Sequence, residues 1–343
     1  MLSDLTNKYL SPYLLWPEKF QSGCHQAKDF LSPQAIREKL LNIKRFICIG
    51  MGGSIAAGQI LQSIVQNHCG KDYVLACDPF SLPQEKTKDD LFILISHSGN
   101  TWEVLFAFEY LCKIDANIMV LSGGGQLIEW AEAQKIDYCK ISANDAPRED
   151  LPIFLGFLLS VVTFSKETSP PIVEPVKSAI SNVLKIYQKA LPDQNFLDIF
   201  GKVSAFHIWA VGQDSYLPAI RARNQFAENS KVSAILGVIP DVFHNLLATF
   251  QSETTIPVLF FHTWHLDSKL EKAIVCVKKL LSEGGVALYS APILGNNWIE
   301  QMISLVIWAD FASIWLAELK GCDPRSIVLL DELKQEIGKN RLI

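Results

Sequence analysis

The first third of the chain carries two glycine- and serine-rich loops, Gly50-Met51-Gly52-Gly53-Ser54 and Ser96-His97-Ser98-Gly99-Asn100-Thr101. Each loop follows a short apolar run, 45–49 or 91–95, of the length and composition of a buried strand. Glycine in the first loop lets backbone N–H groups turn toward an oxyanion at a helix N-terminus. The second loop adds three hydroxyl groups around a glycine. Together, the two loops predict one anion-binding pocket.

A single loop of this kind is also typical of an ordinary strand-to-helix turn. Two such loops favour a binding role, because the carboxyl ends of neighbouring parallel strands meet at one edge of a sheet, where open α/β folds bind ligands. Hydroxyl groups without the lysine of a P-loop suit a terminal monophosphate better than a nucleoside triphosphate. The sequence thus indicates a shared site for a terminal phosphate.

A dinucleotide-binding loop is the main alternative for the glycine-rich stretch. Its Gly-x-Gly-x-x-Gly spacing, counted from Gly50, requires Gly or Ala at the position of Ile55, and the small residues at 56–58 are out of register. Asp78 ends the second predicted strand and could imitate the acid that binds a ribose. The hydroxyl-rich loop has no role in that interpretation, so the fingerprint fails.

Composition predicts a globular protein with a small, locally held ligand. The 343 residues are 49% hydrophobic and 20% charged, which suffices for a sizeable core and favours two domains over one. The formal net charge of −5 is mild, and no Lys/Arg cluster interleaves with aromatic residues. Nucleic acid and anionic membranes are therefore poor candidates for partners.

Several features predict a cytoplasmic location. Eight cysteines are scattered without a Cys-x-x-Cys pair, as is typical of a reducing compartment. Residues 1–5 lack a basic region followed by an apolar run, so no secretory signal is expected. Apolar stretches at 151–164, too short to span a bilayer, and at 303–317, interrupted by Asp310, are predicted to be buried helices.

Strand-like runs alternate with segments of helical length, which predicts βαβ units and a parallel sheet. In the first half, strands are expected near 45–49, 73–77, 91–95, 117–121 and 137–141, and helices near 55–68, 101–113 and 126–134. The Pro-rich stretch 168–175 is interpreted as a linker. The rhythm restarts with strands near 205–211, 232–236, 258–261 and 286–289.

The second half therefore looks like another copy of the same α/β sandwich. Its loops carry neither a hydroxyl cluster nor a glycine run, and Asp214 would repel a phosphate. We predict that the first copy binds the ligand and the second contributes other groups. The expected divisions are 1–165 for an N-terminal helical segment with the first sandwich, 166–195 for a linker and connecting helix, 196–320 for the second sandwich, and 321–343 for a C-terminal helical tail.

Candidate catalytic groups in the second half are Glu228 and His244. A carboxylate near the C-terminal end of a helix feels the negative end of the helix dipole, which raises its pKa toward that of a useful base. Histidine is the side chain best suited to proton transfer near neutral pH. A solvated acid at a helix end and a capping or core histidine remain the alternatives for these two residues.

The other histidines are weaker candidates for catalytic or metal-binding residues. His207 lies inside an apolar strand and is predicted to be a core residue, and the ring of His97 is expected to point away from the pocket that its neighbouring serines line. The spacing of His262, His265 and Asp267 could suggest a metal. Because no further ligand stands at a recognised interval, we favour a loop without a metal.

The two loops resemble those of the sugar isomerase, or SIS, domain, and nearly the whole chain resembles the bifunctional phosphoglucose/phosphomannose isomerase family, which has two SIS domains in tandem. The further motifs that carry the resemblance are Ala146-Pro147-Arg148, the Asn-Gln-x-x-Glu-Asn-x-Lys run at 224–231, His244-Asn245, the stretch from Ala317 to Pro324, and a terminal Leu333-Lys334. They occur in the order found in the family.

The resemblance implies two tandem SIS-type sandwiches and a site assembled from both. It implies that the sugar phosphate is held by Gly53, Ser54, Ser96, Ser98 and Thr101. It also implies that Arg148 steadies the developing negative charge, that Glu228 is the base, and that His244 and Lys334 assist ring opening. In similar enzymes the histidine comes from the neighbouring subunit, so a homodimer is implied.

The expected reaction interconverts glucose 6-phosphate and fructose 6-phosphate, with mannose 6-phosphate as a further candidate substrate. A carboxylate removes the weakly acidic C2 proton and returns it to C1, while a fixed cation stabilises the enediolate. This chemistry needs no metal, nucleotide or redox cofactor. The alternatives are a non-catalytic sugar-phosphate sensor, which would need only the phosphate loops, and an aminosugar-forming isomerase, whose ammonia-supplying glutaminase domain the chain has no room for.

Three positions depart from the family pattern. The family commonly has an acid where this chain has Trp102, a glutamate where it has Asp241, and Thr-Pro where it has Arg325-Ser326. None of these changes removes a candidate catalytic group. They leave substrate preference open, and Arg325 could alter the placement of the helix that carries Lys334.

Overall fold

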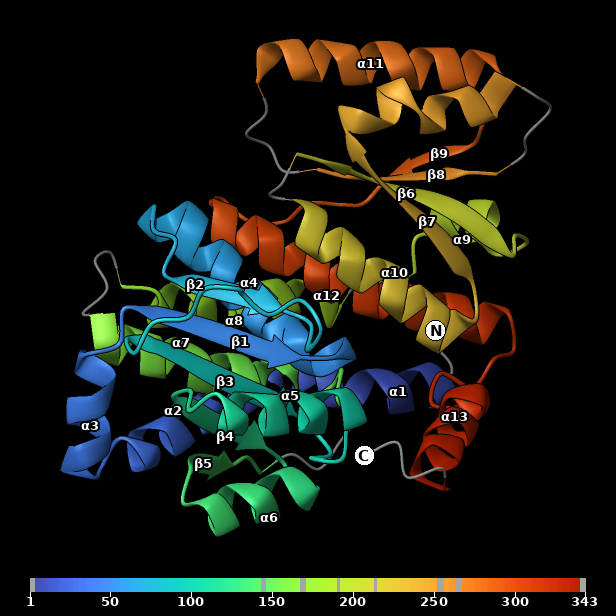
Figure 1. Ribbon diagram of the computed structural model, residues 1–343. Coiled ribbons are helices and arrows are strands. Elements are labelled where there is room, and N and C mark those ends of the chain that lie inside the picture. Colours follow the sequence, from blue (N-terminus) through green and yellow to red (C-terminus); the bar gives the residue numbers. More distant parts are fainter. Residues whose placement is uncertain are drawn as a thin grey trace. The chain divides into compact units, whose positions relative to one another are not determined.

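Two parallel β-sheets organise the chain in the computed structural model, which describes residues 4–142, 146–166, 171–189, 192–212, 215–251, 256–262 and 267–339 (Figure 1). The elements in chain order are α1 (Asp4–Leu14), α2 (Trp16–Phe30), α3 (Gln34–Leu41), β1 (Arg45–Gly50), α4 (Gly52–Cys69), β2 (Val74–Cys77), β3 (Asp90–Ser96), α5 (Trp102–Lys113), β4 (Ile118–Ser122), α6 (Gly125–Gln134), β5 (Asp137–Lys140), α7 (Leu151–Lys166), α8 (Val173–Tyr187), α9 (Gln194–Phe200), β6 (Ala205–Val211), α10 (Tyr216–Ser230), β7 (Ser233–Ile239), the 3₁₀ turns η2 (Asp241–His244) and η3 (Leu246–Gln251), β8 (Val258–Phe261), α11 (Ser268–Glu283), β9 (Leu288–Ser290), α12 (Trp298–Leu319) and α13 (Val328–Lys339).

The chain forms two compact units, each built around one sheet. The first-sheet unit comprises Leu15–Ser178 and Leu329–Ile343, and the second-sheet unit comprises Met1–Leu14 and Ala179–Val328. The two parallel α/β sandwiches confirm the fold class predicted from the sequence. Each unit is described by itself below.

The first sheet has the strand order β2-β1-β3-β4-β5, and its pairings are all parallel. The chain runs from β1 outward to β2 and then returns across the sheet to β3, which pairs with the other side of β1. The register places Gly50, at the end of β1, beside Ile95 near the end of β3. The two predicted loops therefore emerge next to each other at the switch point, where doubly wound sheets bind ligands.

Helices cover both faces of the first sheet. On one face, α5 and α6 bury an apolar cluster against β1, β3 and β4 that includes Ile49, Leu94 and Val120. On the other face, α4 packs so closely on β1 that a Cβ at Gly58 would lie 2.7 Å from the Cβ of Cys48. Burial raises the pKa of the Cys48 thiol to about 12, in agreement with a core role. All eight cysteines are free.

Helices α2 and α7 cross at two glycines. A Cβ at Gly23 would overlap the carbonyl oxygen of Ile153, and a Cβ at Gly156 would overlap the carbonyl oxygen of Phe20. The crossing brings the backbones of the two helices into direct contact, which any larger side chain would prevent. Residues of α2 one turn away are consequently held beside the start of α7.

The predicted linker over 168–175 is wrong at its C-terminal end. Helix α8 begins at Val173, so Glu174 and Pro175 lie in its first turn rather than in a loop. Proline fits there because its missing N–H has no intrahelical acceptor in the first turn of a helix. Residues 167–170 lie outside the described residues.

The second sheet has the order β7-β6-β8-β9 and repeats the parallel, doubly wound arrangement with four strands. Within this unit, α11 and the two 3₁₀ turns lie on one side of the sheet and α10 and α12 on the other (Figure 1). An aromatic cluster fills the second side, where the ring of Trp308 on α12 contacts those of Phe226 on α10 and Phe261 on β8.

The two apolar stretches are buried helices, as predicted. Helix α7 is buried along most of its length, and so is α12. Among the described residues, α12 is the one helix that is long and apolar enough to cross a membrane, and 89% of its most apolar window is buried. Burial of this kind is typical of a core helix in a soluble domain.

We predict that Gly156→Ala destabilises the first-sheet unit. The added methyl group cannot be accommodated without separating α2 from α7, and overpacking of this kind costs about 1–3 kcal/mol. Urea unfolding followed by circular dichroism measures the change. Gly284→Ala is the matched control, since a Cβ at Gly284 would meet its nearest atoms at an ordinary 3.4 Å. Equal unfolding midpoints for the two variants would contradict the prediction.

Candidate active site

The first predicted loop forms the start of helix α4. The helix begins at Gly52, three residues earlier than expected, so Gly53 and Ser54 lie in its first turn. Backbone N–H groups in the first turn of a helix have no intrahelical acceptor and favour anions. The Ser54 hydroxyl accepts a hydrogen bond from the backbone N–H of His97 over 3.1 Å. This bond ties the first loop to the second.

The second loop is held by its own hydroxyl groups. The hydroxyls of Ser96 and Thr101 are 2.9 Å apart, and the backbone N–H of Gly99 donates to Ser96 Oγ over 3.0 Å. The N–H of Asn100 donates to Ser98 Oγ over 3.2 Å. A serine hydroxyl that accepts an N–H still carries its own proton. Donors for an anion are therefore present around a rigid turn.

A third loop, Ser122-Gly123-Gly124-Gly125, braces the second loop, and the sequence interpretation missed it. Ser122 donates its hydroxyl proton to the carbonyl oxygen of Ser96 over 2.7 Å. Gly99 has a φ of +70°, and a Cβ there would overlap the carbonyl oxygen of Gly124. The signal was available, because the glycine run follows the predicted strand at 117–121 as the other loops follow theirs.

Arg148 lies beside the first loop although 95 positions separate it from Gly53 in sequence. A Cβ at Gly53 would lie 3.3 Å from the backbone nitrogen of Arg148 and from the carbonyl carbon of Pro147. The Arg148 residue is 6% exposed. The first-sheet unit thus brings together the phosphate-loop candidates and the segment that carries the candidate cation, a combination that can stabilise negative charge.

Glu228 lies in the last turn of α10 in the second-sheet unit and is half-buried. The helix ends at Ser230, and the next residue, Lys231, adopts the left-handed conformation with φ +58°. The position at a helix C-terminus is the one predicted from the sequence. Helix α10 is anchored to α12 by the buried pair of Arg221 Nη2 and Asp310 Oδ2, 2.9 Å apart.

A second buried contact on α10 lies next to Glu228. The side-chain amide of Asn229 donates to Ser313 Oγ over 2.9 Å and to Gln225 Oε1 over 3.2 Å. Asn229 is fully buried, and its partner Ser313 belongs to α12. These contacts fix the rotation of α10, so they determine which way the Glu228 side chain leaves the helix.

His244 and Lys334 are exposed. His244 ends the 3₁₀ turn η2, and the following residue, Asn245, donates its side-chain amide to Asp241 Oδ2 over 2.9 Å. The 3₁₀ turn η3 follows from Leu246 onward. Lys334 lies on α13, where its ammonium group is 3.7 Å from Asp331 Oδ1. Within the first-sheet unit, no contact among the described residues assigns the Lys334 side chain to the loop site.

The departures from the family pattern have local structural roles. Trp102 begins α5 directly after Thr101 and packs on Phe80, with the ring centroids 5.7 Å apart. Arg325 donates its backbone N–H to Asp323 Oδ1 over 2.9 Å. That hydrogen bond is the main cause that lowers the pKa of the Asp323 carboxyl, and a hydrogen bond from the Tyr9 hydroxyl to the same carboxyl is the next. The pair ties the Asp-Pro turn to α1 within the second-sheet unit.

Among the other predictions, the one for His207 is confirmed, and two of the residues named fall outside the described part of the chain. His207 is a core residue, as predicted, because it is 2% exposed in β6 and burial lowers its pKa. Asp214 and His265 lie outside the described residues. Asp267 caps α11 by accepting the N–H of Lys269 over 2.8 Å.

Comparison with known proteins supports the interpretation of the whole chain. Residues 196–337 match the model of the bacterial phospho-glucose isomerase C-terminal SIS domain. The chain is 27% identical to a bifunctional phosphoglucose/phosphomannose isomerase of Caldicellulosiruptor bescii, covering 94% of this chain and 97% of that protein. A protein of the same description from Aquifex aeolicus is 25% identical, covering 89% and 94%.

Among solved structures, the C-terminal domain of glucosamine-fructose-6-phosphate aminotransferase from Francisella tularensis superimposes with a TM-score of 0.66, covering 93% of this chain and 98% of that domain. At 15% identity, this likeness shows the shared fold alone. The chain is thus a tandem SIS-type sugar-phosphate isomerase. It is similar over most of its length to bifunctional phosphoglucose/phosphomannose isomerases, which confirms the resemblance predicted from its sequence.

We predict that Ser54→Ala weakens the binding of inorganic phosphate roughly tenfold, because hydrogen bonds to charged groups contribute about 1.5–3 kcal/mol. Isothermal titration calorimetry measures the dissociation constant. Ser63→Ala is the matched control, since Ser63 lies on the same helix and its hydroxyl accepts from Asn67 over 3.3 Å. Unchanged phosphate affinity in Ser54→Ala would remove Ser54 from the site.

Proposed function

We propose that the chain interconverts glucose 6-phosphate and fructose 6-phosphate, with mannose 6-phosphate as a second aldose substrate. The observation that carries the proposal is the convergence of three loops and the Arg148 segment at the β1/β3 switch point. Hydroxyl and N–H donors there suit the phosphate of a sugar, and the adjacent cation suits the charge that develops during isomerisation.

The phosphate site is proposed to consist of Gly53, Ser54, Ser96, Ser98 and Thr101. Four of these residues supply hydroxyl groups, and Gly53 supplies a backbone N–H in the first turn of α4. The phosphate is remote from the reacting carbons. Binding it therefore serves to orient the sugar, which converts binding energy into a lower barrier for the chemical step.

The proposed chemistry is one proton transfer carried out in two halves. After ring opening, the Glu228 carboxylate removes the C2 proton of the aldose, and the electron pair forms the enediolate while the carbonyl oxygen at C1 gains negative charge. Arg148 stabilises that charge. The hydroxyl proton on O2 then passes to the oxyanion on O1, Glu228 returns the carbon-bound proton to C1, and the carbonyl forms at C2. Oxidation at C2 and reduction at C1 balance within the sugar, so the proposal includes no redox cofactor or metal.

Ring opening is assigned to His244 and Lys334. One group takes the proton of the anomeric hydroxyl and another donates a proton to the ring oxygen, which a histidine and a lysine can do between them. The exposed position of both side chains leaves them accessible to a bound sugar or to another subunit.

The proposed assembly is a soluble cytoplasmic homodimer in which His244 acts in the site of the neighbouring subunit. The proposed domains remain 1–165 for the phosphate-binding sandwich with its preceding helices, 166–195 for the connection, 196–320 for the sandwich with the base, and 321–343 for the tail with Lys334. Neither nucleic acid nor a membrane is included as a partner.

We predict that Glu228→Gln lowers kcat about 10²–10⁴-fold, the usual contribution of a general base, while binding of fructose 6-phosphate is retained. A coupled spectrophotometric assay with fructose 6-phosphate and mannose 6-phosphate measures turnover, and a thermal-shift titration measures binding. Glu283→Gln is the matched control, because Glu283 also lies in the last turn of a helix and its side chain is exposed.

Two results would contradict this assignment. Unchanged turnover in Glu228→Gln would show that another group is the base. The sensor alternative would be supported instead if the wild-type protein turned over neither sugar although sugar phosphate still raised its melting temperature.

The shared-site assembly predicts complementation between inactive subunits. When equal amounts of the Glu228→Gln and His244→Ala variants are mixed and exchange subunits, each mixed dimer has one intact site. Random pairing makes about half of the dimers mixed, so about one quarter of wild-type activity is restored. The readout is turnover before and after exchange, with each variant alone as the control. If the mixture stays inactive while mixed dimers form, His244 acts within its own subunit.

A further inference from the structure

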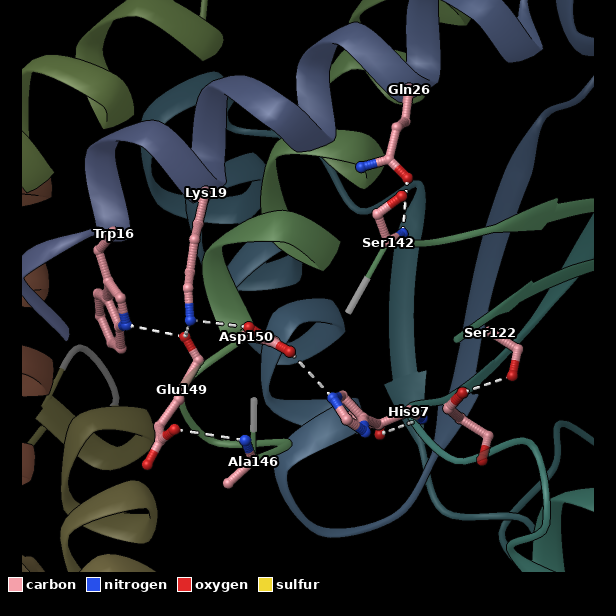
Figure 2. A network of polar contacts seen from close by, with 11 residues as sticks. Trp16, Lys19, Gln26, His97, Ser122, Ser142, Ala146, Glu149 and Asp150 are labelled. Atoms are coloured by element: carbon pink, nitrogen blue, oxygen red, sulfur yellow. Dashed lines mark hydrogen bonds and ion pairs between the residues drawn. The ribbon is translucent and has the colours of Figure 1, made fainter. Parts of the chain in front are cut away.

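A buried cluster of charged groups, formed by Lys19, His97 and Asp150, adjoins the phosphate loops. The Lys19 ammonium is 2.8 Å from Asp150 Oδ1, and His97 Nε2 is 3.1 Å from Asp150 Oδ2. The side chains are 10%, 16% and 1% exposed for Lys19, His97 and Asp150. Figure 2 shows the three in line, with Asp150 between the lysine of α2 and the histidine of the second loop.

His97 contacts every part of the loop site. Its backbone N–H donates to Ser54 Oγ in the first loop, and its carbonyl oxygen accepts the N–H of Gly123 in the third loop over 3.2 Å. Its ring reaches Asp150, two residues after Arg148. One residue therefore joins the three loops to the segment that carries the candidate cation.

The segment at 146–150 is held from the side of α2 as well. The indole N–H of Trp16 and the ammonium group of Lys19 both lie 3.1 Å from the carbonyl oxygen of Glu149. The Glu149 carboxylate accepts the N–H of Ala146 over 3.3 Å (Figure 2). The glycine crossing of α2 and α7 fixes this support, because it sets the distance of Lys19 from Asp150.

A carboxylate near a phosphate site has to be explained, because it repels the ligand. Both oxygens of Asp150 are engaged, one by an ammonium group and one by an imidazole. A buried carboxylate held between two such partners is compensated, and removal of one partner leaves an uncompensated buried charge. The arrangement keeps the charge of Asp150 directed at its two partners and makes the position of the His97 ring depend on Asp150.

We propose that His97 is a positioning residue for the phosphate loops and that Asp150, balanced by Lys19, is its anchor. The ring contact fixes the His97 backbone, and that backbone places Ser54, the second loop and the third loop around the anion. The identity of the anion as the phosphate of a sugar rests on the proposed function, whereas the positioning role does not.

Asp150→Asn tests the anchor with inorganic phosphate as the probe. The amide cannot compensate Lys19 and accept from His97 as the carboxylate does, so the loops lose their common support. We expect the dissociation constant for phosphate, measured by calorimetry, to rise about tenfold, within the range that misplacement of site groups produces. KM for fructose 6-phosphate is expected to rise more than kcat falls.

Asp90→Asn is the matched control. Asp90 is a buried carboxylate at the opposite end of β3, where it pairs with Arg45 over 2.8 Å, and its side chain is 3% exposed. We expect it to lower the melting temperature without changing phosphate affinity. If Asp150→Asn also lowers only the melting temperature and leaves phosphate affinity within about twofold of wild type, the cluster merely stabilises the fold and the proposal is overturned.

A second pair of variants keeps the test decisive if Asp150→Asn fails to fold. His97→Gln places an amide N–H near the position of Nε2 and can still donate to Asp150, whereas His97→Ala cannot. We expect near wild-type phosphate affinity for the glutamine variant and about tenfold weaker binding for alanine. Equal affinities for the two variants would overturn the proposal. If these binding results hold but the wild type turns over neither sugar, the proposed function fails and the positioning role stands.

Discussion

The parallel pairing of β1 with β3 is the constraint on which the candidate site depends. The two strands are separated in sequence by α4 and β2, yet they are neighbours in the sheet and end at the same edge. Helices α4 and α5 begin directly after the loops that follow these strands, and the first turn of a helix favours an anion. Every other contact of the loop site, from the Ser54 hydroxyl to the bracing glycine run, adjusts an arrangement that this pairing has already created.

Close backbone packing connects the loop site to the rest of the first-sheet unit. Gly99 allows the second loop to lie against the third, and Gly23 and Gly156 allow α2 to lie against α7. Side chains are absent at these contacts, so the backbone hydrogen bonds and the buried ion pair of Lys19 and Asp150 determine the geometry. The proposed phosphate site benefits from this rigidity, because its donors need not reorganise when the ligand binds.

The second-sheet unit repeats the sandwich with different buried polar contacts. Its helix α10 presents polar residues to its buried side, where Arg221 and Asn229 contact α12, and the same helix ends with Glu228. A surface-facing polar helix would rotate and slide more freely than one fixed by buried polar pairs. The proposed separation of phosphate binding and proton transfer between the two copies thus agrees with their different loops and with their different helix packing.

Local patterns in the sequence were sufficient to predict the strands, both phosphate-loop candidates, the two buried helices and the family resemblance. These features depend on residues within a few positions of one another, where periodicity, glycine and hydroxyl groups constrain the backbone directly. The contact between Gly53 and the Arg148 segment, the cluster of Lys19, His97 and Asp150, and the bracing role of Ser122 required the tertiary structure. Lys19 and Asp150 are 131 positions apart, and no spacing in a single sequence reveals such a pair, because the packing of two whole helices brings them together.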